Sequence, residues 1–150
     1  MTRTPDDLAR TALDFRVAVG RIGRRIRQIY ATTDSATDPG FLEISVLLRL
    51  DRQGPLTSKA LAEIESVTPQ AIGTSLSALE GRGLVARSRD PSDGRRVITT
   101  ITRAGRGVLA SREHAMNERT ITAFRDGFDA SERRQLAAVI PLLERFATEL

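Results

Sequence analysis

The chain has no cysteine and no tryptophan, and only one histidine, one tyrosine and one lysine among its 150 residues. The missing thiol excludes disulfides, thiolate nucleophiles, cysteine metal ligands and redox sensing by a thiol. A single histidine, His114, cannot build a metal site. A small hydrolase using His114 can be drawn, but the glycine pattern of a nucleophile elbow is missing, as are Walker and dinucleotide-binding patterns. We therefore predict neither an enzyme nor a cofactor.

Long apolar runs are also missing. No stretch reaches the roughly 20 apolar residues that a membrane-spanning helix needs. The N-terminus carries Asp6 and Asp7 and lacks the apolar core of a signal peptide, so we expect a cytoplasmic protein. A length of 150 residues with 40% hydrophobic content suits a single domain with a modest core.

Positive charge is concentrated in one quarter of the chain. Residues 82–106 hold seven arginines against two aspartates, a net charge of +5, whereas the whole chain is +4. The remainder is therefore about neutral. Arginine presents a planar fork of donors that matches phosphate, so this segment suits a polyanion such as nucleic acid. Ordinary surface charge is the alternative.

Residues 66–81 predict a helix with one apolar and one polar face. Thr68 stands at the N-cap position and Pro69 at the first helical position, where a missing N–H costs nothing. The apolar face has helical spacing and comprises Ile72, Leu76 and Leu79. The opposite face has no carboxylate and suits base edges and phosphates, although a solvated face is the alternative; it comprises Gln70, Thr74 and Ser77.

A hairpin is predicted to follow, once Gly81 and Gly83 have ended the helix. Residues 84–89 and 96–102 are short alternating or β-branched runs, typical of strands. The turn between them has a proline to set φ, and Asp93-Gly94 to allow positive φ. An arginine-rich hairpin beside a polar helix can touch backbone or minor groove while the helix enters the major groove.

Residues 56–105 resemble the winged helix-turn-helix core of MarR-type transcriptional regulators. The pattern LxxLExxGLVxR occurs from Leu76 to Arg87, and DPxDxRxVxxxxT runs from Asp90 to Thr102. A Thr-x-x-Gly step follows at Thr102 and Gly105. The resemblance implies a sequence-specific, double-stranded-DNA-binding homodimer that represses transcription in response to a ligand. A transcriptional activator of the same fold, or a winged-helix protein-interaction module that does not bind DNA, are the alternatives.

The fold implied is mainly α with a small β-hairpin wing, in one MarR-like domain spanning 1–150. A winged-helix core at 41–102 is flanked by dimerisation helices at 1–30 and 103–150. In the core we expect short helices at 41–50 and 58–64, with Phe41, Ile44, Leu47, Leu48, Leu61 and Ile64 inward. Leu56 is expected to add a brief strand, and Thr57 and Thr102 to cap the helices that follow them.

The terminal helices carry apolar stripes. The first helix has a heptad-like seam, for which we prefer packing across a dimer to packing within one domain; its members are Leu8, Ala12, Phe15, Val19, Ile22, Ile26 and Ile29. Asp129 and Glu132 predict a capping box for the last helix, and Pro141 predicts a kink within it. The last helix has its own apolar face of Leu136, Val139, Ile140, Leu143 and Phe146.

Each predicted DNA-binding residue has an expected role. Gln70 suits a base edge because a carboxamide can pair with adenine in two bonds. Ser66 and Thr68 suit a phosphate at the helix N-terminus. The resemblance places Arg95 in the minor groove, two residues after an Asp93 that orients an arginine. The predicted set is Ser66, Thr68, Pro69, Gln70, Thr74, Ser77, Arg89, Asp93, Arg95 and Arg96.

The resemblance also implies an effector, since the family commonly binds small aromatic or phenolic acids between its helical stalk and its winged region. The candidates, by location alone, are Phe15, Tyr30, Phe41 and His114. A core or interface role is the favoured reading for each of the four. No metal site is predicted.

Overall fold

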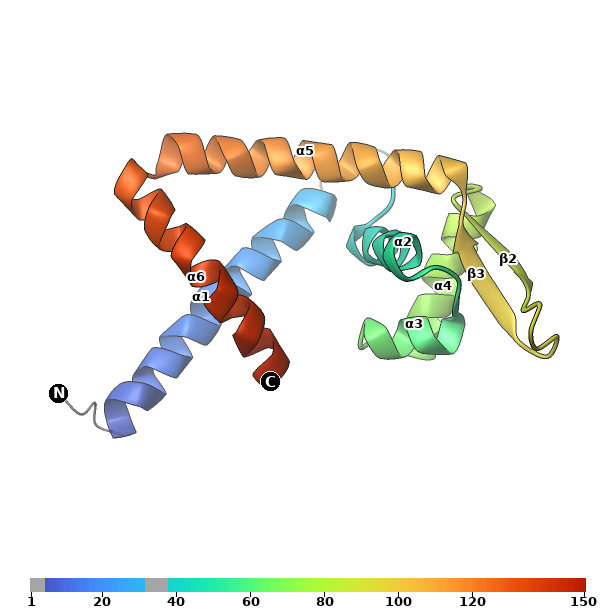
Figure 1. The fold of residues 1–150 in the computed structure, drawn as a ribbon, viewed down its shortest axis with the longest axis horizontal. Helices are drawn as coiled ribbons and strands as arrows, with labels where there is room; N and C mark the ends of the chain where they lie inside the picture. The colour runs from blue at the N-terminus through green and yellow to red at the C-terminus, as the bar shows by residue number, and fades with distance from the viewer. Residues whose placement is uncertain (1–4, 32–37) are drawn as a thin grey trace. The chain divides into compact units, whose positions relative to one another are not determined.

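The computed structural model describes residues 5–31 and 38–150. Helices dominate and one small sheet is present, as Figure 1 shows. In chain order the elements are α1 (Pro5–Ala31), α2 (Phe41–Gln53), β1 (Leu56–Thr57), α3 (Ser58–Ile64), α4 (Pro69–Gly81), β2 (Val85–Arg89), β3 (Val97–Ile101), α5 (Arg103–Gly127) and α6 (Ala130–Glu149). The predicted fold class, mainly α with a small β-hairpin wing, is confirmed. The chain forms two compact units, Met1–Arg106 and Gly107–Leu150.

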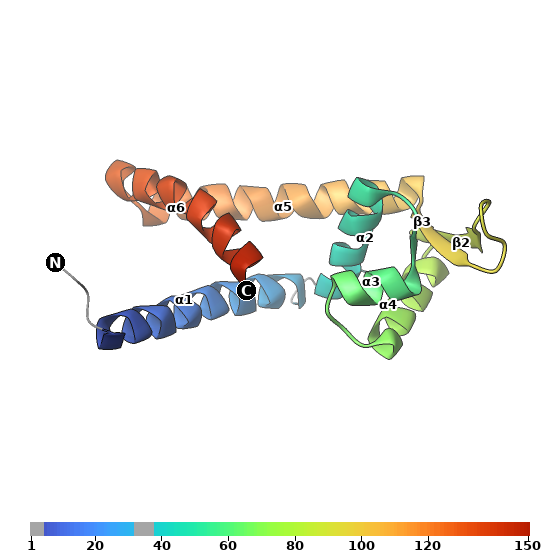
Figure 2. The ribbon, with the colours of Figure 1, turned by 60° about the horizontal axis from the view of Figure 1, so that its bottom comes forward.

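The sheet of the first unit is antiparallel, with strand order β1-β3-β2. Val85 pairs with Ile101 and Arg89 with Val97, which confirms the predicted hairpin. Leu56 pairs with Thr99, so the brief strand expected at Leu56 exists. Figures 1 and 2 show the closed end of the β2–β3 hairpin extending away from α2, α3 and α4.

The core of the first unit lies between α2, α3, α4 and the sheet. Its most deeply buried apolar side chains are Val46, Leu47, Leu61, Ile72, Leu76 and Leu79. Two predicted core residues are outside it: Phe41 is 42% exposed and Ile64 is 36% exposed. Phe41 begins α2 and turns toward Tyr30 of α1, while Ile64 ends a helix of seven residues that buries Leu61 and Ala62 instead.

The end of α4 is a Schellman turn that directs the chain into β2. Gly83 has φ +69°, and its N–H donates to the Glu80 carbonyl at 2.9 Å. The Leu84 N–H donates to the Leu79 carbonyl, also at 2.9 Å. Glycine reaches this left-handed conformation without a Cβ penalty. The predicted glycine stop is therefore Gly83, whereas Gly81 is the last helical residue.

The start of α5 is held against the same turn. Thr102 Oγ1 donates to the Gly83 carbonyl at 2.7 Å and accepts from the Gly105 N–H at 3.0 Å, which confirms the predicted cap. Gly105 lies so close to Leu84 that an added Cβ would overlap the Leu84 carbonyl oxygen. The Thr-x-x-Gly step thus has a physical reason: the threonine caps the helix and the glycine lets the helix approach the chain before β2.

The second unit contains most of α5 together with α6. Asp129 accepts from the Ser131 and Glu132 N–H groups, and Glu132 accepts from the Asp129 N–H, so the predicted capping box is confirmed. The helix α6 continues through Pro141 as far as Glu149. Among residues 5–31 and 38–150, none of the helices has an apolar stretch long enough to cross a membrane.

Candidate nucleic-acid interface

The helices α3 and α4 are joined by a tight turn that presents the N-terminus of α4. Ser66 has φ +53°, and the Ser66 and Val67 N–H groups donate back to the carbonyls of Glu63 and Ala62. Thr68 then caps α4, because its Oγ1 accepts from the Ala71 N–H at 3.2 Å. The predicted N-cap and first-position proline are confirmed, and they place Ser66, Thr68 and Pro69 at one exposed end of α4.

The two faces of α4 separate as the spacing predicts. Ile72, Leu76 and Leu79 are completely buried. Gln70, Thr74 and Ser77 are all exposed, and no carboxylate stands among them. The Thr74 hydroxyl donates to the Gln70 carbonyl at 3.1 Å, so its lone pairs and methyl group remain for outside contacts.

A hollow of about 430 Å³ lies between α3 and the N-terminus of α4. It is lined by Ser58, Lys59, Ala62, Glu63, Val67 and Pro69. Lys59 Nζ lies 3.9 Å from Glu63 Oε1, one helical turn away on α3. Lys59 was not among the predicted site residues.

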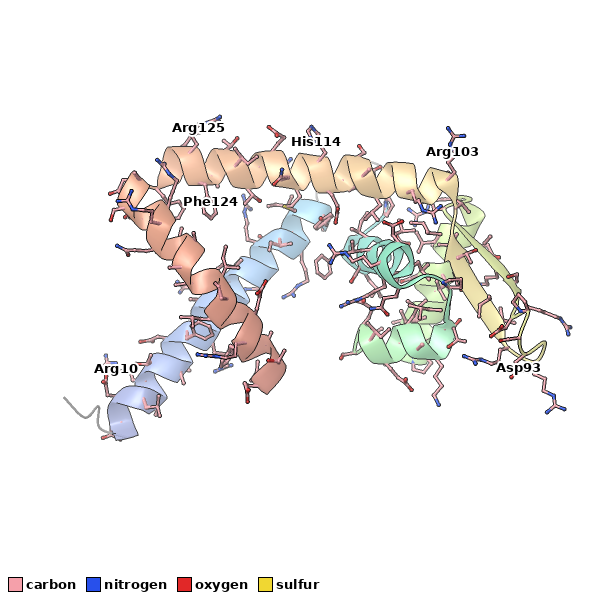
Figure 3. All side chains as sticks on the ribbon, viewed as in Figure 1. Arg10, Asp93, Arg103, His114, Phe124 and Arg125 are labelled. Carbon is pink, nitrogen blue, oxygen red and sulfur yellow. The ribbon has the colours of Figure 1, made fainter. Side chains whose placement is uncertain are left out.

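The wing tip is built by aspartate side chains. Asp90 Oδ1 accepts from the Ser92 N–H and Oγ, at 2.8 and 2.7 Å, and Asp93 Oδ1 accepts from the Arg95 N–H at 3.1 Å. The hydrogen bonds from Ser92, assisted by the Arg96 guanidinium, lower the pKa of Asp90 below its usual value near 3.8. Asp93 lies at the tip in Figure 3, and it orients Arg95 through the backbone.

One expectation about this turn is wrong, because Gly94 does not adopt positive φ. The Asp90 N–H donates to the Arg96 carbonyl at 2.9 Å, and the Arg96 N–H donates to the Asp93 carbonyl at 2.9 Å. These backbone bonds, together with the side-chain hydrogen bonds of Asp90 and Asp93, close the turn, and no residue from 90 to 96 adopts positive φ. The Asp-Gly pair therefore acts here through its carboxylate and not through the freedom of glycine.

Four of the seven arginines in residues 82–106 are paired within the first unit. The pairs are Arg82–Glu43 at 2.6 Å, Arg87–Glu80 at 3.5 Å, Arg96–Asp90 at 3.9 Å and Arg106–Asp51 at 3.0 Å. Within the described part of the chain, no carboxylate lies within 4 Å of Arg89, Arg95 or Arg103. The charge available to a polyanion is therefore smaller than the sequence count of +5. It is concentrated at the wing, with Arg103 at the start of α5 (Figure 3).

The four effector candidates do not form one cluster. The rings of Tyr30 and Phe41 meet edge to face, with centroids 5.8 Å apart and planes at 64°. Phe15 precedes Tyr30 on α1 by a rise of about 22 Å at 1.5 Å per residue, so it is not beside that pair. His114 is an exposed residue of α5 in the second unit (Figure 3).

The second unit has a hollow of its own. Its volume is about 590 Å³, and it is lined by Thr120, Ile121, Phe124, Arg125 and Arg133. Figure 3 shows Phe124 in the angle between α5 and α6. No residue of this hollow was among the predicted site residues. Within the residues that the structure describes, no three His, Asp or Glu side chains gather in a way that could hold a metal ion.

Comparison with known proteins identifies the family. The model of the MarR family matches residues 42–97, which run from α2 through β1, α3, α4 and β2 to the first residue of β3. A crystal structure of a Pseudomonas aeruginosa protein superposes with a TM-score of 0.79 and 31% identity, covering 97% of this chain and 98% of that one. The chain belongs to the MarR family. The MarR family comprises transcriptional regulators, so the protein is a DNA-binding transcriptional regulator and the resemblance read from the sequence is confirmed.

Two further similar proteins have a described activity. The Mycobacterium bovis protein named HTH-type transcriptional repressor Mb2911 is 47% identical over 72 residues, which are 47% of this chain and 51% of that one. A structure of Bordetella bronchiseptica BpsR has 25% identity and a TM-score of 0.62, and covers 87% of this chain and 98% of that one. The DNA binding of BpsR is regulated by 6-hydroxynicotinic acid.

Proposed function

We propose that the protein is a homodimeric, ligand-responsive repressor that binds a pseudo-palindromic double-stranded operator. The observation that carries the proposal is the exposed, carboxylate-free face of α4 beside a wing whose Arg89 and Arg95 have no carboxylate within reach among the described residues. Such a face permits base contacts without repelling phosphate. The guanidinium groups of Arg89 and Arg95 supply the attraction to the backbone, and Arg89 Nη1 also donates to the Gly94 carbonyl at 3.3 Å.

Each part of this surface has a proposed role. Gln70, Thr74 and Ser77 face base edges in the major groove. Ser66, Thr68 and Pro69 lie against a phosphate at the N-terminus of α4, where unpaired backbone N–H groups attract anions. The wing contributes Arg95 to the minor groove and Arg89 and Arg96 to the backbone, with Asp93 holding the Arg95 backbone in place.

The proposed dimer uses the terminal helices, residues 1–30 and 103–150, around the winged-helix core at 41–102. Apolar side chains of α1 are exposed in the single chain, among them Leu8, Val19 and Ile22. The apolar face of α6 is also exposed, with Leu136, Val139, Ile140, Leu143 and Phe146 each more than one third accessible. Two such faces, on helices of 27 and 20 residues, favour a second copy as the surface that covers them.

A small-molecule effector is proposed from the relationship to BpsR, whose DNA binding 6-hydroxynicotinic acid regulates. In this chain, the edge-to-face pair of Tyr30 and Phe41 offers aromatic surface to a planar ligand. Repression is favoured over activation by the likeness to the repressor Mb2911. A winged-helix module that binds only protein is disfavoured by the wing arginines Arg89 and Arg95, which have no carboxylate partner among the described residues.

Selection of duplex DNA with the purified protein tests the proposal. A randomised duplex library is bound, recovered and sequenced, and a symmetric consensus with half-sites about one helical turn apart is expected. Recovery of no preferred sequence, or binding that does not weaken as salt is added, would contradict it.

The arginine at the wing tip allows a sharper prediction. Arg95→Ala is expected to weaken binding to the recovered duplex and to reduce the slope of log affinity against log salt by about one unit. Fluorescence anisotropy at several salt concentrations measures both quantities. The matched control is Arg119→Ala, an equal loss of charge on α5 of the second unit. If the two variants bind alike, the wing does not contact DNA.

A further inference from the structure

The helix α2 makes an ionic contact with the C-terminal end of α4. Glu43 lies in the first turn of α2, and Arg82 is the C-cap residue of α4. Glu43 Oε1 lies 2.6 Å from Arg82 Nη2, and the two side chains are only 16% and 22% exposed. The other oxygen of Glu43 accepts from the Gly40 N–H at 2.8 Å, so this carboxylate also closes the N-terminus of α2. We call this the Glu43 anchor.

A second contact joins α2 to the turn before α4. Glu65 is the C-cap residue of α3, and its side chain is 10% exposed. Both of its oxygens bind α2: Oε2 accepts from Ser45 Oγ at 2.5 Å and Oε1 from Arg49 Nε at 3.0 Å. The next residue is Ser66, whose positive φ turns the chain toward Thr68 and α4. We call this the Glu65 anchor.

The remaining contact of α4 with the core is apolar. Ile72, Leu76 and Leu79 bury their side chains, but apolar burial is non-directional and tolerates small rotations and shifts of a helix. The Glu43–Arg82 ion pair fixes the separation of two oppositely charged groups, and the charge-assisted hydrogen bonds of Glu65 have defined lengths and directions. Base contacts require a side chain held within about half an ångström and roughly ten to twenty degrees of the productive geometry. An element with anchors at both ends meets that requirement.

We propose that Glu43 and Glu65 are positioning residues, through which α2 fixes the orientation of α4 and thereby the selectivity of DNA binding. The inference rests on the proposed function, in which α4 reads base edges. Neither carboxylate touches DNA itself. Their effect is on selective binding, because phosphate contacts survive a small rotation of α4 whereas paired base contacts do not.

The test uses Glu43→Gln and Glu65→Gln in the full-length protein. Each change keeps the size of the side chain and removes one negative charge. Electrostatics alone would make both variants bind DNA more tightly. Loss of an anchor instead lowers affinity for the selected duplex about tenfold while affinity for a scrambled duplex of equal composition is unchanged, the size expected for one paired base contact. Circular dichroism confirms that each variant is folded at the temperature of the assay.

The matched control is Asp51→Asn. Asp51 also lies on α2, and its ion pair is with an arginine of α5, Arg106, at 3.0 Å, and not with α4. The change removes one negative charge from the helix that carries Glu43, so the ratio of selected to scrambled affinity should equal that of the wild type. An equal loss of selectivity in Asp51→Asn, or no loss in either glutamate variant, overturns the proposal.

Hydrogen exchange separates this inference from the proposed function. If the wild type selects no sequence, the proposed function has failed. The positioning role of Glu43 and Glu65 is then tested by the rate of hydrogen exchange at the backbone amides of α4. Faster exchange of α4 in the glutamate variants, with no such change in Asp51→Asn, supports the positioning role. Unchanged exchange of α4 in both glutamate variants overturns it.

Discussion

Ser66 carries the most unusual backbone conformation among the described residues. It is the one residue other than glycine there with positive φ, at +53°, and it occupies the place that glycine takes at many helix ends. A left-handed conformation costs a residue with a Cβ about 1–2 kcal/mol. We propose that the Ser66 hydroxyl, which a glycine would lack, contacts a phosphate at the N-terminus of α4.

Replacing this serine should separate stability from binding. Ser66→Gly is expected to raise the free energy of unfolding by about 1 kcal/mol, because the left-handed strain is removed. Affinity for the selected duplex should fall in the same variant, since a proposed phosphate contact is lost. Urea denaturation and anisotropy measure the two effects.

The control for this change is Ala78→Gly, at an exposed interior position of α4, which should lower the free energy of unfolding by about 1 kcal/mol. A Ser66→Gly protein that is less stable than the wild type would contradict the assignment of strain.

Asp90 gives the wing a response to acid. Its pKa is lowered by hydrogen bonds from Ser92 and by Arg96, so the ionised form stabilises the folded turn. This stabilisation is complete above the usual value near 3.8 and is lost as the pH falls through the lower folded-state pKa. In an NMR titration the Ser92 amide should shift with a midpoint below pH 3.8. Asp90→Asn should abolish that shift, and a midpoint above 3.8 in the wild type would contradict the prediction.

At the scale of the elements, the ends of helices and strands were predictable because their signals are local. Thr68 with Pro69 marked the start of α4, and Asp129 with Glu132 marked the start of α6. Pairings between elements were not predictable. Arg106 and Asp51 are 55 residues apart, and no spacing rule indicates that they meet. The charge that residues 82–106 offer to a polyanion was therefore overestimated. The contacts of the Glu43 anchor and the Glu65 anchor were not predicted.

The burial of individual side chains was predicted less well than the elements that carry them. Periodicity placed Phe41 and Ile64 on inward faces, but both lie at a helix end, where the core no longer covers the face. The apolar stripe of α4 was predicted correctly because α3, β2 and α2 all pack against that helix and bury Ile72, Leu76 and Leu79. The proposed DNA-binding residues remain predictions, since their exposure is compatible with the role without testing it.

Two glycines of α5 should respond to the same substitution with opposite signs. An added Cβ at Gly105 overlaps the Leu84 carbonyl and comes within 2.8 Å of Ile101 Cγ1, whereas at Gly107 it meets nothing within 4 Å. Gly105→Ala should therefore lower the free energy of unfolding by roughly 1–3 kcal/mol.

Gly107→Ala is the matched control and should raise the free energy of unfolding by about 0.5–1 kcal/mol, because alanine favours a helix. Thermal denaturation compares the two variants. A Gly105→Ala protein as stable as the wild type would show that α5 does not need its close approach to Leu84.

At the scale of the whole molecule, symmetry is the central question. The proposed operator has two half-sites, so two copies of α4 must be held at a fixed separation. Exposed apolar faces on α1 and α6 are the surfaces available for that purpose. Selectivity would then depend on two features. Within each protomer, α2 holds α4 in place, and across the dimer the terminal helices hold the two protomers at a fixed separation.

A charge on the apolar face of α6 should separate the protomers. Ile140→Glu places a carboxylate where we propose that a second copy packs, and burying an unpaired charge is strongly unfavourable. Sedimentation velocity should show a monomer, and binding to the symmetric duplex should weaken.

Ala138→Glu is the control for this change, since it adds the same charge on the opposite side of α6. If both variants sediment like the wild type, α6 does not form the dimer interface.

The single lysine has a practical consequence. Lys59 lines the hollow between α3 and α4, and every other basic side chain except His114 is an arginine. An amine-specific fluorophore would therefore attach to one side chain only, besides the chain's own α-amino group. That dye would lie beside the hollow between α3 and α4, where its emission would report the binding and release of a duplex in real time.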